Sequence, residues 1–174
     1  AIRHHVYQEK DVAMGPLLRA LRADFRNAEK TRRLLLNRTP RYGNDDERAD
    51  ALSREVFEMY FRAVDDRPNM RGGRYRINLL PTTVHIYFGK KTGASADGRR
   101  AGEPLSEGIP PVQGADRGGP TAVLKSAAKI DHLRTGGTLL NQKFAPQLLA
   151  GDEGIARLGH LVRAYFAMNG HHVQ

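Results

Sequence analysis

The histidines are the residues of this sequence whose type first suggests metal chemistry, and there are seven of them. His4-His5 and His171-His172 are adjacent pairs, and adjacent side chains on a strand point to opposite faces. No two histidines have the i, i+4 spacing, with a carboxylate partner, that zinc hydrolases use. His85 lies among aromatic residues, and we interpret it as a hydrogen-bonded core histidine. The sequence therefore predicts no metal site in this chain.

Among the polar clusters of the sequence, Asp97-Gly98-Arg99-Arg100 is the one whose residues could most readily bind a ligand. Asp-Gly favours a tight turn, and two arginines after it can clamp a carboxylate or backbone carbonyl groups. We interpret the stretch as a structural turn rather than a substrate clamp. The sequence also lacks the residues that several other kinds of chemistry require. The chain has no cysteine, which excludes disulfides, thiol nucleophiles and Cys-ligated metals, and it has no Gly-x-Ser-x-Gly elbow.

The net charge of +9 raises the question of a nucleic-acid partner. Residues 1–76 hold 17 basic and 12 acidic side chains, and residues 77–174 hold 11 and 7, so the positive excess is evenly spread. Such a pattern favours a solvated, arginine-rich surface and predicts no nucleic-acid partner. No apolar run approaches the length of about 18 residues that a membrane span requires, and no signal peptide is visible, so we expect a cytoplasmic protein without a membrane partner.

The first third of the chain, residues 1–70, is predicted to be mainly helical. Pro16 suits the first turn of a helix, and leucines follow it at helical spacing. A second helical stretch runs through Leu34–Leu36 and ends before Pro40. The polar run Asn44–Glu47 supplies a cap and acidic residues at the start of a third helix.

Residues 71–174 are predicted to alternate between strands and helices. Arg74–Gly89 is rich in aromatic and β-branched residues and predicts a strand bent at Pro81, and Gly89–Pro120 predicts a long, ordered Gly/Pro-rich loop. The later predicted elements are a helix at Thr121–Ile130, a strand at Thr138–Phe144, a helix at Gly154–Met168 and a strand opening at His171–Gln174. This alternation predicts an α/β fold with parallel pairing.

Three groups of segments together resemble glycyl radical enzymes of the pyruvate-formate-lyase type, in the branch of the glycerol dehydratases and carbon-heteroatom lyases. The first group is Asn78–Gly89 running into Gly93–Ser106, with the Asp-Gly-Arg-Arg stretch. The others are Pro111–Gln113 with Gly119–Ser126, and Gly137–Phe144 with Gly170–Gln174. The resemblance covers residues 40–174 strongly and the opening helices more loosely.

This resemblance implies a ten-stranded α/β barrel with surrounding helices and the active site inside. A stored glycyl radical would abstract hydrogen from a cysteine, and the thiyl radical would then abstract hydrogen from a small diol-like or amino-alcohol substrate. No cofactor would be bound. A separate activating enzyme, which uses S-adenosylmethionine and an iron–sulfur cluster, would install the radical. The full-length protein would be a radical dehydratase or lyase and a homodimer.

The sequence departs from the family pattern at the residues that perform this chemistry. It has no cysteine and no Arg-Val-x-Gly-Tyr segment, so no catalytic residue and no radical glycine are expected in this chain. We expect residues 1–174 to be a single fragment of a pyruvate-formate-lyase-type domain, inactive as it stands, with both missing parts elsewhere in a longer protein. The alternative is a free-standing scaffold or partner domain without catalysis.

The chain is predicted to contribute part of the wall of the active site, next to the substrate. Leu80, Thr82 and Val84 share one parity of the predicted strand, so one face of that strand could meet the substrate. Leu139, in the next predicted strand, is the fourth candidate. The possibility that these residues only pack the barrel has equal weight.

Overall fold

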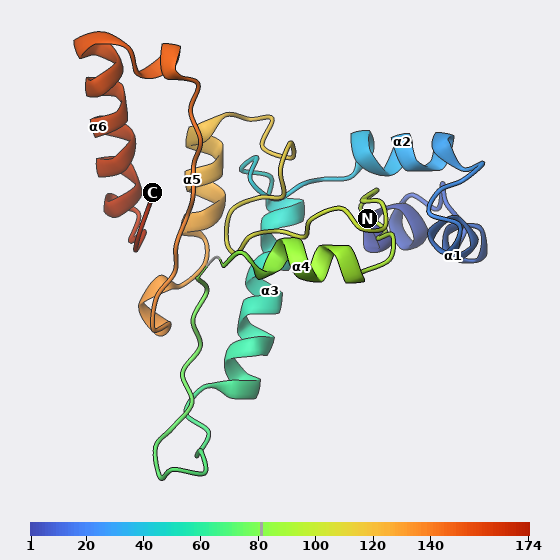
Figure 1. Cartoon of the computed structure of the whole chain (residues 1–174), viewed down its shortest axis with the longest axis horizontal. Helices are drawn as coiled ribbons and strands as arrows, with labels where there is room; N and C mark the ends of the chain where they lie inside the picture. Colours follow the sequence, from blue (N-terminus) through green and yellow to red (C-terminus); the bar gives the residue numbers. More distant parts are fainter. Residues whose placement is uncertain (81) are drawn as a thin grey trace. The chain divides into compact units, whose positions relative to one another are not determined.

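The computed structural model describes residues 1–80 and 82–174. Two compact units are present, and each combines two separate stretches of the chain. Unit 1 consists of Ala1–Pro40 and Thr83–Leu105, and unit 2 consists of Arg41–Thr82 and Ser106–Gln174. Figure 1 shows the helices of both units coloured along the sequence.

Unit 1 is built from helices and a loop. Its elements are the π-helix η1 (Ile2–Gln8), α1 (Met14–Arg22), α2 (Glu29–Arg38) and α4 (Val84–Lys91). The helices predicted after Pro16 and through Leu34–Leu36 are therefore confirmed. Their apolar faces meet in a small core in which Leu17, Phe25 and Leu35 are almost fully buried.

Unit 2 holds the larger core and the longer helices. Its elements are α3 (Glu47–Val64), α5 (Pro120–Ala128), η2 (His132–Arg134), η3 (Pro146–Leu149) and α6 (Gly151–Ala167). The predicted cap of α3 is confirmed, because the Asp46 side chain accepts a hydrogen bond from the Arg48 backbone N–H at 3.0 Å. The core of the unit is formed by apolar residues from α3, α5, α6 and the segments between them.

The extended segments of unit 2 pair at single positions. Leu79 bridges Thr138, and Leu140 bridges Val173, both in the parallel sense. The parallel pairing predicted for the segments at 138–144 and 171–174 is thus confirmed at these two points. Within residues 1–80 and 82–174 the pairing takes the form of isolated bridges rather than continuous ladders.

The strand predicted over Arg74–Gly89 is wrong, because residues 74–80 contribute only isolated bridges, at Arg74 and Leu79, and Val84–Lys91 forms α4. The bend predicted at Pro81 lies outside the described residues. Contacts within unit 1 stabilise α4 against the β-propensity of its side chains. The Leu105 N–H donates to the His85 carbonyl oxygen at 3.3 Å, and a Cβ on Gly89 would lie 2.5 Å from the Glu103 carbonyl oxygen. His85 is consequently half-buried on a helix, so its interpretation as a core residue is also wrong.

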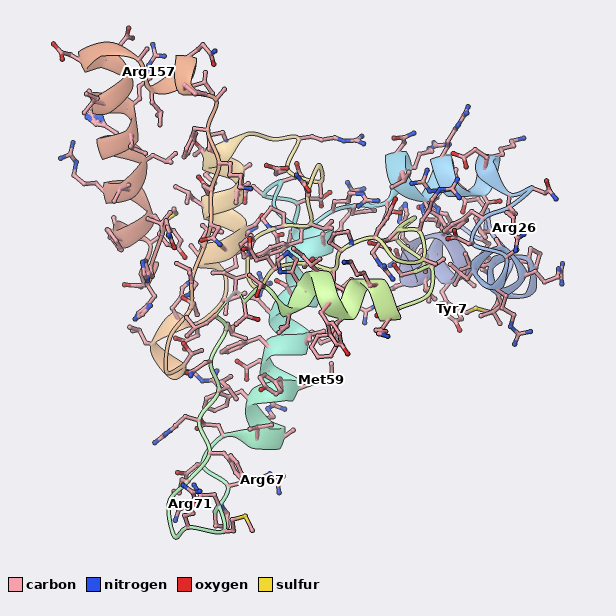
Figure 2. The ribbon with its side chains drawn as sticks, in the orientation of Figure 1. Tyr7, Arg26, Met59, Arg67, Arg71 and Arg157 are labelled. Atoms are coloured by element: carbon pink, nitrogen blue, oxygen red, sulfur yellow. The ribbon has the colours of Figure 1, made fainter. Side chains whose placement is uncertain are left out.

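Arginines contribute widely to the exposed surface. Figure 2 labels Arg26, Arg67, Arg71 and Arg157, which come from three different stretches of the chain, and all four side chains are exposed. This distribution agrees with the interpretation of the net charge as a solvated surface. The absence of a nucleic-acid partner stays a prediction.

Candidate functional site

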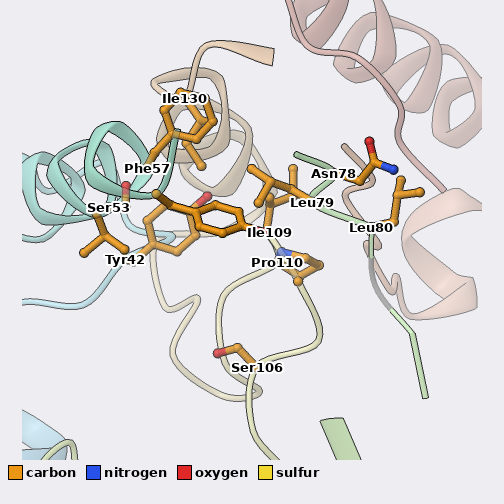
Figure 3. Close-up of a pocket in the computed structure, with 13 residues that line it drawn as sticks. Tyr42, Ser53, Phe57, Asn78, Leu79, Leu80, Ser106, Ile109, Pro110 and Ile130 are labelled. Carbon is orange, nitrogen blue, oxygen red and sulfur yellow. The ribbon is translucent and has the colours of Figure 1, made fainter. Parts of the chain in front are cut away.

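A mainly apolar cavity of about 440 Å³ lies within unit 2. Its wall is formed by α3, by the extended segment that contains Asn78 and by the loop that contains Ile109 (Figure 3). Tyr42 and Phe57 add aromatic surface, and Ser53, Asn78 and Ser106 add a few polar groups. Concave apolar surfaces with a small number of polar groups are the usual form of small-molecule sites. This cavity is therefore the candidate site of the chain.

The four predicted wall residues end up in different surroundings. Leu80 lines the cavity and is 48% exposed, so the structure brings this one predicted residue to the site. Thr82 and Leu139 lie outside the lining of the cavity, although the Leu139 N–H donates to the Leu79 carbonyl oxygen at 3.2 Å. Val84 is the first residue of α4 in unit 1. The prediction that Leu80, Thr82 and Val84 share one strand face is therefore wrong, because the extended backbone ends before Val84.

The side chain of Asn78 packs against Gly136. A Cβ on Gly136 would lie 2.1 Å from Asn78 Oδ1, so any other residue there would displace the Asn78 side chain. The Gly136 N–H also donates to the Ile77 carbonyl oxygen at 2.8 Å. This backbone hydrogen bond holds the segment of Gly136 beside the segment of Asn78, a residue that lines the cavity.

A buried carboxylate lies on α3, the helix that also forms part of the cavity wall. Asp50, in the first turns of α3, is fully buried, and its Oδ2 accepts hydrogen bonds from Lys129 Nζ at 2.7 Å and Ser126 Oγ at 3.0 Å. Burial lowers the pKa of Lys129, but its hydrogen bonds to Asp50 and Asp45 outweigh burial and raise that pKa well above its usual range. Lys129 therefore remains a cation, and Asp50 has a permanent counter-ion.

His132 forms a second buried polar group in unit 2. Nε2 lies 2.9 Å from the Ala127 carbonyl oxygen, which can only accept, so Nε2 carries the proton. Nδ1 then accepts from the Thr138 hydroxyl at 2.8 Å. Burial lowers the pKa of His132, which favours this neutral form. The His132 ring also packs edge-on against Tyr165 in the core.

The Asp-Gly-Arg-Arg stretch forms a turn in unit 1, as predicted. Gly98 has a φ of +93°, and the Gly98 N–H donates to the Ser95 carbonyl oxygen at 3.0 Å. The guanidinium group of Arg99 is buried and donates to the backbone carbonyl oxygens of Glu103 at 2.7 Å, Arg100 at 3.0 Å and Gly93. The interpretation as a structural turn is confirmed, because this arginine binds the backbone of its own loop.

Sequence reasoning missed the buried polar residues of unit 2. By sequence, Asp50 and His132 are ordinary residues of a helix and of the segment that follows one. The signal for Asp50 was a carboxylate between Ala49 and Ala51, close to the apolar side of α3. That signal is weak, since carboxylates beside alanine are common on exposed helix surfaces.

In the described part of the chain, residues 1–80 and 82–174, His, Asp and Glu side chains do not gather in threes as a metal site would require. Across the same residues no helix combines the length and apolar character needed to cross a membrane.

Comparison with known proteins agrees with the resemblance described above. Residues 1–89 match the family described as "Pyruvate formate lyase-like", and residues 105–174 match the family described as "Glycine radical". The chain belongs to the pyruvate formate lyase-like family of glycyl radical enzymes. The expected resemblance is thus confirmed over both halves of the sequence.

Among individual relatives, a trans-4-hydroxy-L-proline dehydratase from Clostridioides difficile is 52% identical over 174 residues, which are 100% of this chain and 22% of the relative. A (2S)-3-sulfopropanediol dehydratase from Klebsiella oxytoca is 36% identical over 99% of this chain, again 22% of the relative. The chain therefore spans about a fifth of the length of these curated relatives.

Solved structures give the same picture for the fold. The structure of hydroxyproline dehydratase from Clostridioides difficile, with trans-4-hydroxy-L-proline bound, matches with a TM-score of 0.97 and 51% identity over 99% of this chain and 22% of that chain. The glycerol-bound, B12-independent glycerol dehydratase from Clostridium butyricum matches with a TM-score of 0.94 and 42% identity over the same shares. Both similar structures are dehydratases.

Proposed function

We propose that this chain is part of a glycyl radical enzyme that eliminates water from a small hydroxylated substrate, with trans-4-hydroxy-L-proline as the first candidate. The supporting observation is the identity of 52% over the whole chain to a dehydratase of that substrate, compared with 36% to a sulfopropanediol dehydratase and 33–34% to isethionate sulfite-lyases. A carbon-heteroatom lyase acting on another diol-like or amino-alcohol substrate is the second candidate within the same class.

In this proposal, residues 1–174 form one part of a pyruvate-formate-lyase-type domain. The parallel bridges at Leu79–Thr138 and Leu140–Val173 would be points where neighbouring strands of a ten-stranded barrel pair. The hydrogen-abstracting cysteine and the radical glycine would belong to other parts of the polypeptide, since the 174 residues include no cysteine. The radical would be installed by an S-adenosylmethionine-dependent activating enzyme acting on a cytoplasmic homodimer.

The contribution of this chain would be an apolar wall. Leu80 offers an exposed apolar side chain next to the cavity, and Thr82, Val84 and Leu139 remain candidates for contact with the substrate in the complete barrel. An apolar wall excludes water from a radical intermediate and from the departing hydroxyl group. Positioning and shielding are the tasks that a protein performs for radical chemistry of this kind.

The test uses the complete polypeptide that contains this chain, activated without oxygen by its activating enzyme. Electron paramagnetic resonance should show an organic radical, and a panel of trans-4-hydroxy-L-proline, glycerol, propane-1,2-diol and isethionate should show turnover of the first. A radical without turnover of that substrate would refute the substrate assignment. Failure to form any radical under activating conditions would refute the enzyme class.

Two further measurements sharpen the proposal. Leu80→Ala should lower kcat/KM by about 10-fold or more if the side chain contacts the substrate, whereas Leu148→Ala, at an exposed position of η3, should leave it unchanged. The intact mass separates the alternatives of fragment and free-standing domain. A mature protein of 19.4 kDa would support a scaffold or partner domain, and a protein several times larger would support the enzyme.

A further inference from the structure

The extended segment 78–80, which lines the cavity, is paired with its neighbour by few backbone hydrogen bonds. The Leu79 N–H donates to the Gly137 carbonyl oxygen at 2.8 Å, and the Leu79 carbonyl oxygen accepts from the Leu139 N–H at 3.2 Å. These two bonds flank Thr138 and form the parallel bridge between Leu79 and Thr138. Because the pairing is an isolated bridge, the backbone by itself offers little resistance to a shift of one segment along the other.

The residues before Thr138 cannot fix this pairing with side chains, because they are Gly136 and Gly137. Register is weakly specified in glycine-rich strands, and a slip by one residue turns every side chain to the opposite face. Thr138 is the first residue after the glycines whose side chain can oppose such a slip. It is fully buried, and its hydroxyl group donates to His132 Nδ1 at 2.8 Å.

His132 is itself held in place by groups outside the segment 78–80. Its Nε2 donates to the carbonyl oxygen of Ala127, in α5, at 2.9 Å, and only 2% of the residue is exposed. The Thr135 hydroxyl donates to the His132 carbonyl oxygen at 2.9 Å and accepts from the Gly137 N–H at 3.2 Å. Both the ring and the backbone of His132 are therefore fixed, so the ring can hold the side chain of Thr138.

The turn that contains His132, η2, also contacts α3, which forms another part of the cavity wall. Arg134 Cζ lies 3.9 Å from the centre of the Phe61 ring, and Arg134 Nη2 donates to Glu58 Oε2 at 3.2 Å. The same Cζ lies 5.6 Å from the centre of the ring of Phe57, a residue that lines the cavity. One short turn thus contacts α3 through Arg134 and, through His132, the segment that pairs with residues 78–80.

We propose that His132 is a positioning residue, which through Thr138 sets the register at which the segment 78–80 lines the cavity. All three residues of this segment belong to the lining (Figure 3), and a slip by one position would replace each of them by its neighbour. His132 lies outside the lining and acts only through other residues. The consequence for catalysis rests on the proposed function, in which Leu80 is an apolar contact of the substrate.

The first test is hydrogen–deuterium exchange of the complete polypeptide that contains this chain, without substrate. Thr138→Val removes the hydroxyl group and keeps the branched shape of the side chain. It should speed exchange of the Leu79 and Leu139 amides about 10-fold, because a buried hydrogen bond is lost, and should leave the amides of α6 unchanged. Thr138→Ser is the matched control, because it keeps the hydroxyl group and should keep most of the protection.

Three outcomes of this experiment would overturn the proposal. They are equal exchange in the wild type and Thr138→Val, an equally large acceleration in Thr138→Ser, and an acceleration that extends equally to α6. The last outcome would show a general loss of stability rather than a loss of register.

A second pair of variants applies if Thr138→Val does not fold. His132→Asn places an amide oxygen near the position of Nδ1 and can still accept from the Thr138 hydroxyl. His132→Gln places its amide nitrogen near the position of Nε2 and retains only the bond to the Ala127 carbonyl oxygen. Exchange at Leu79 should therefore be faster in His132→Gln than in His132→Asn. Equal rates or the reverse order would contradict the assigned role of His132.

The catalytic consequence is measured on the activated enzyme with trans-4-hydroxy-L-proline. Thr138→Val should raise KM about fivefold or more and leave kcat and the radical signal near the wild-type values, because only binding of the substrate is weakened. In the Leu80→Ala background the same substitution should have less than half that effect on KM. An unchanged KM, or equal effects in both backgrounds, would refute the positioning of Leu80 by this route.

Failure of this inference and failure of the proposed function are distinguishable. If the radical forms and the substrate is not turned over, the substrate assignment fails. The exchange experiment uses no substrate and no radical, so it still decides whether His132 fixes the register of the segment.

Discussion

The two units of this protein each bury a charged side chain, and they do so in different ways. In unit 1, Arg99 donates to carbonyl oxygens that lie one, four and six residues away along the chain. In unit 2, Asp50 accepts from Ser126 and Lys129, which are 76 and 79 residues distant. The first buried charge is satisfied by its own loop, and the second only by folding of the whole unit. Local sequence can therefore indicate the first and not the second.

The difference has an energetic side as well. The guanidinium group of Arg99 replaces its hydration by several neutral carbonyl dipoles, which a rigid loop holds in place. Asp50 depends on one opposite charge and one hydroxyl group. Loss of the opposite charge would leave the Asp50 carboxylate uncompensated in the protein interior, where the dielectric constant is low. The following substitutions test this contrast.

The largest effect is expected for the substitution Asp50→Ala. Removal of the buried carboxylate abolishes its hydrogen bonds to Lys129 and Ser126, and two hydrogen bonds to a charged group should together contribute about 3–5 kcal/mol to the free energy of unfolding. Urea denaturation of both proteins measures the change. Asp45→Ala is the control, because Asp45 also contacts Lys129, at 2.9 Å, but lies at the surface and should matter little. Equal effects of the two substitutions would show that burial of Asp50 is not what makes its pair important.

A smaller effect is expected when the backbone of the Arg99 loop is altered. Gly98→Ala introduces a side chain at φ +93° and places its Cβ 2.7 Å from Leu36 Cγ. Strain and overpacking together should lower the free energy of unfolding by about 2–4 kcal/mol.

Gly102→Ala is the matched control for that substitution. Gly102 has a similar φ of +82°, but no atom lies within 4 Å of the position that a Cβ would occupy there, so only the backbone strain of about 1 kcal/mol should remain. If both substitutions had the same effect in urea denaturation, the packing of Gly98 against α2 would be irrelevant to the stability of the loop.

The substitution Arg99→Lys tests the local clamp itself. Lysine keeps the charge but lacks the fork of donors, so the contacts to several carbonyl groups cannot form together. We expect a loss of about 2–3 kcal/mol in the free energy of unfolding, corresponding to one or two charged hydrogen bonds. Arg100→Lys should cost under about 1 kcal/mol, because its pair with Glu29 is partly exposed. Identical losses at the two positions would contradict the assigned role of Arg99.

The smallest effect concerns His132, a buried polar residue that is neutral. Burial lowers its pKa in the folded state below the unfolded value of about 6.5. The contribution of His132 to stability is therefore complete above about pH 6.5 and declines as the pH falls towards the folded-state pKa. Urea denaturation between neutral and mildly acidic pH should show this decline in the wild type but not in His132→Gln. A variant that loses stability just as steeply would assign the decline to other groups.

Elements stabilised by interactions between sequence neighbours were predicted correctly, and elements stabilised by residues distant in the sequence were not. The helix at Glu47–Val64 was predictable because its cap, Asp46, and its dipole-compensating acids are neighbours in sequence. The helix at Val84–Lys91 was not, because its β-branched and aromatic residues favour a strand locally, and contacts from Glu103 and Leu105 override that preference. The same error removed Val84 from the predicted strand face, while Leu80 lies at the cavity and its contact with a substrate stays a prediction.

The sequence alone determined the family, the helices of residues 14–64, the absence of cysteine and the turn at Asp97–Arg100, since each depends on residue identity or on neighbours a few positions apart. Only the tertiary structure decided that Asp50 is buried beside Lys129, that Tyr42 faces a cavity and that His132 bonds Thr138 in the core. These pairings join residues whose separation in the chain carries no local signal, and burial itself is a property of the folded unit.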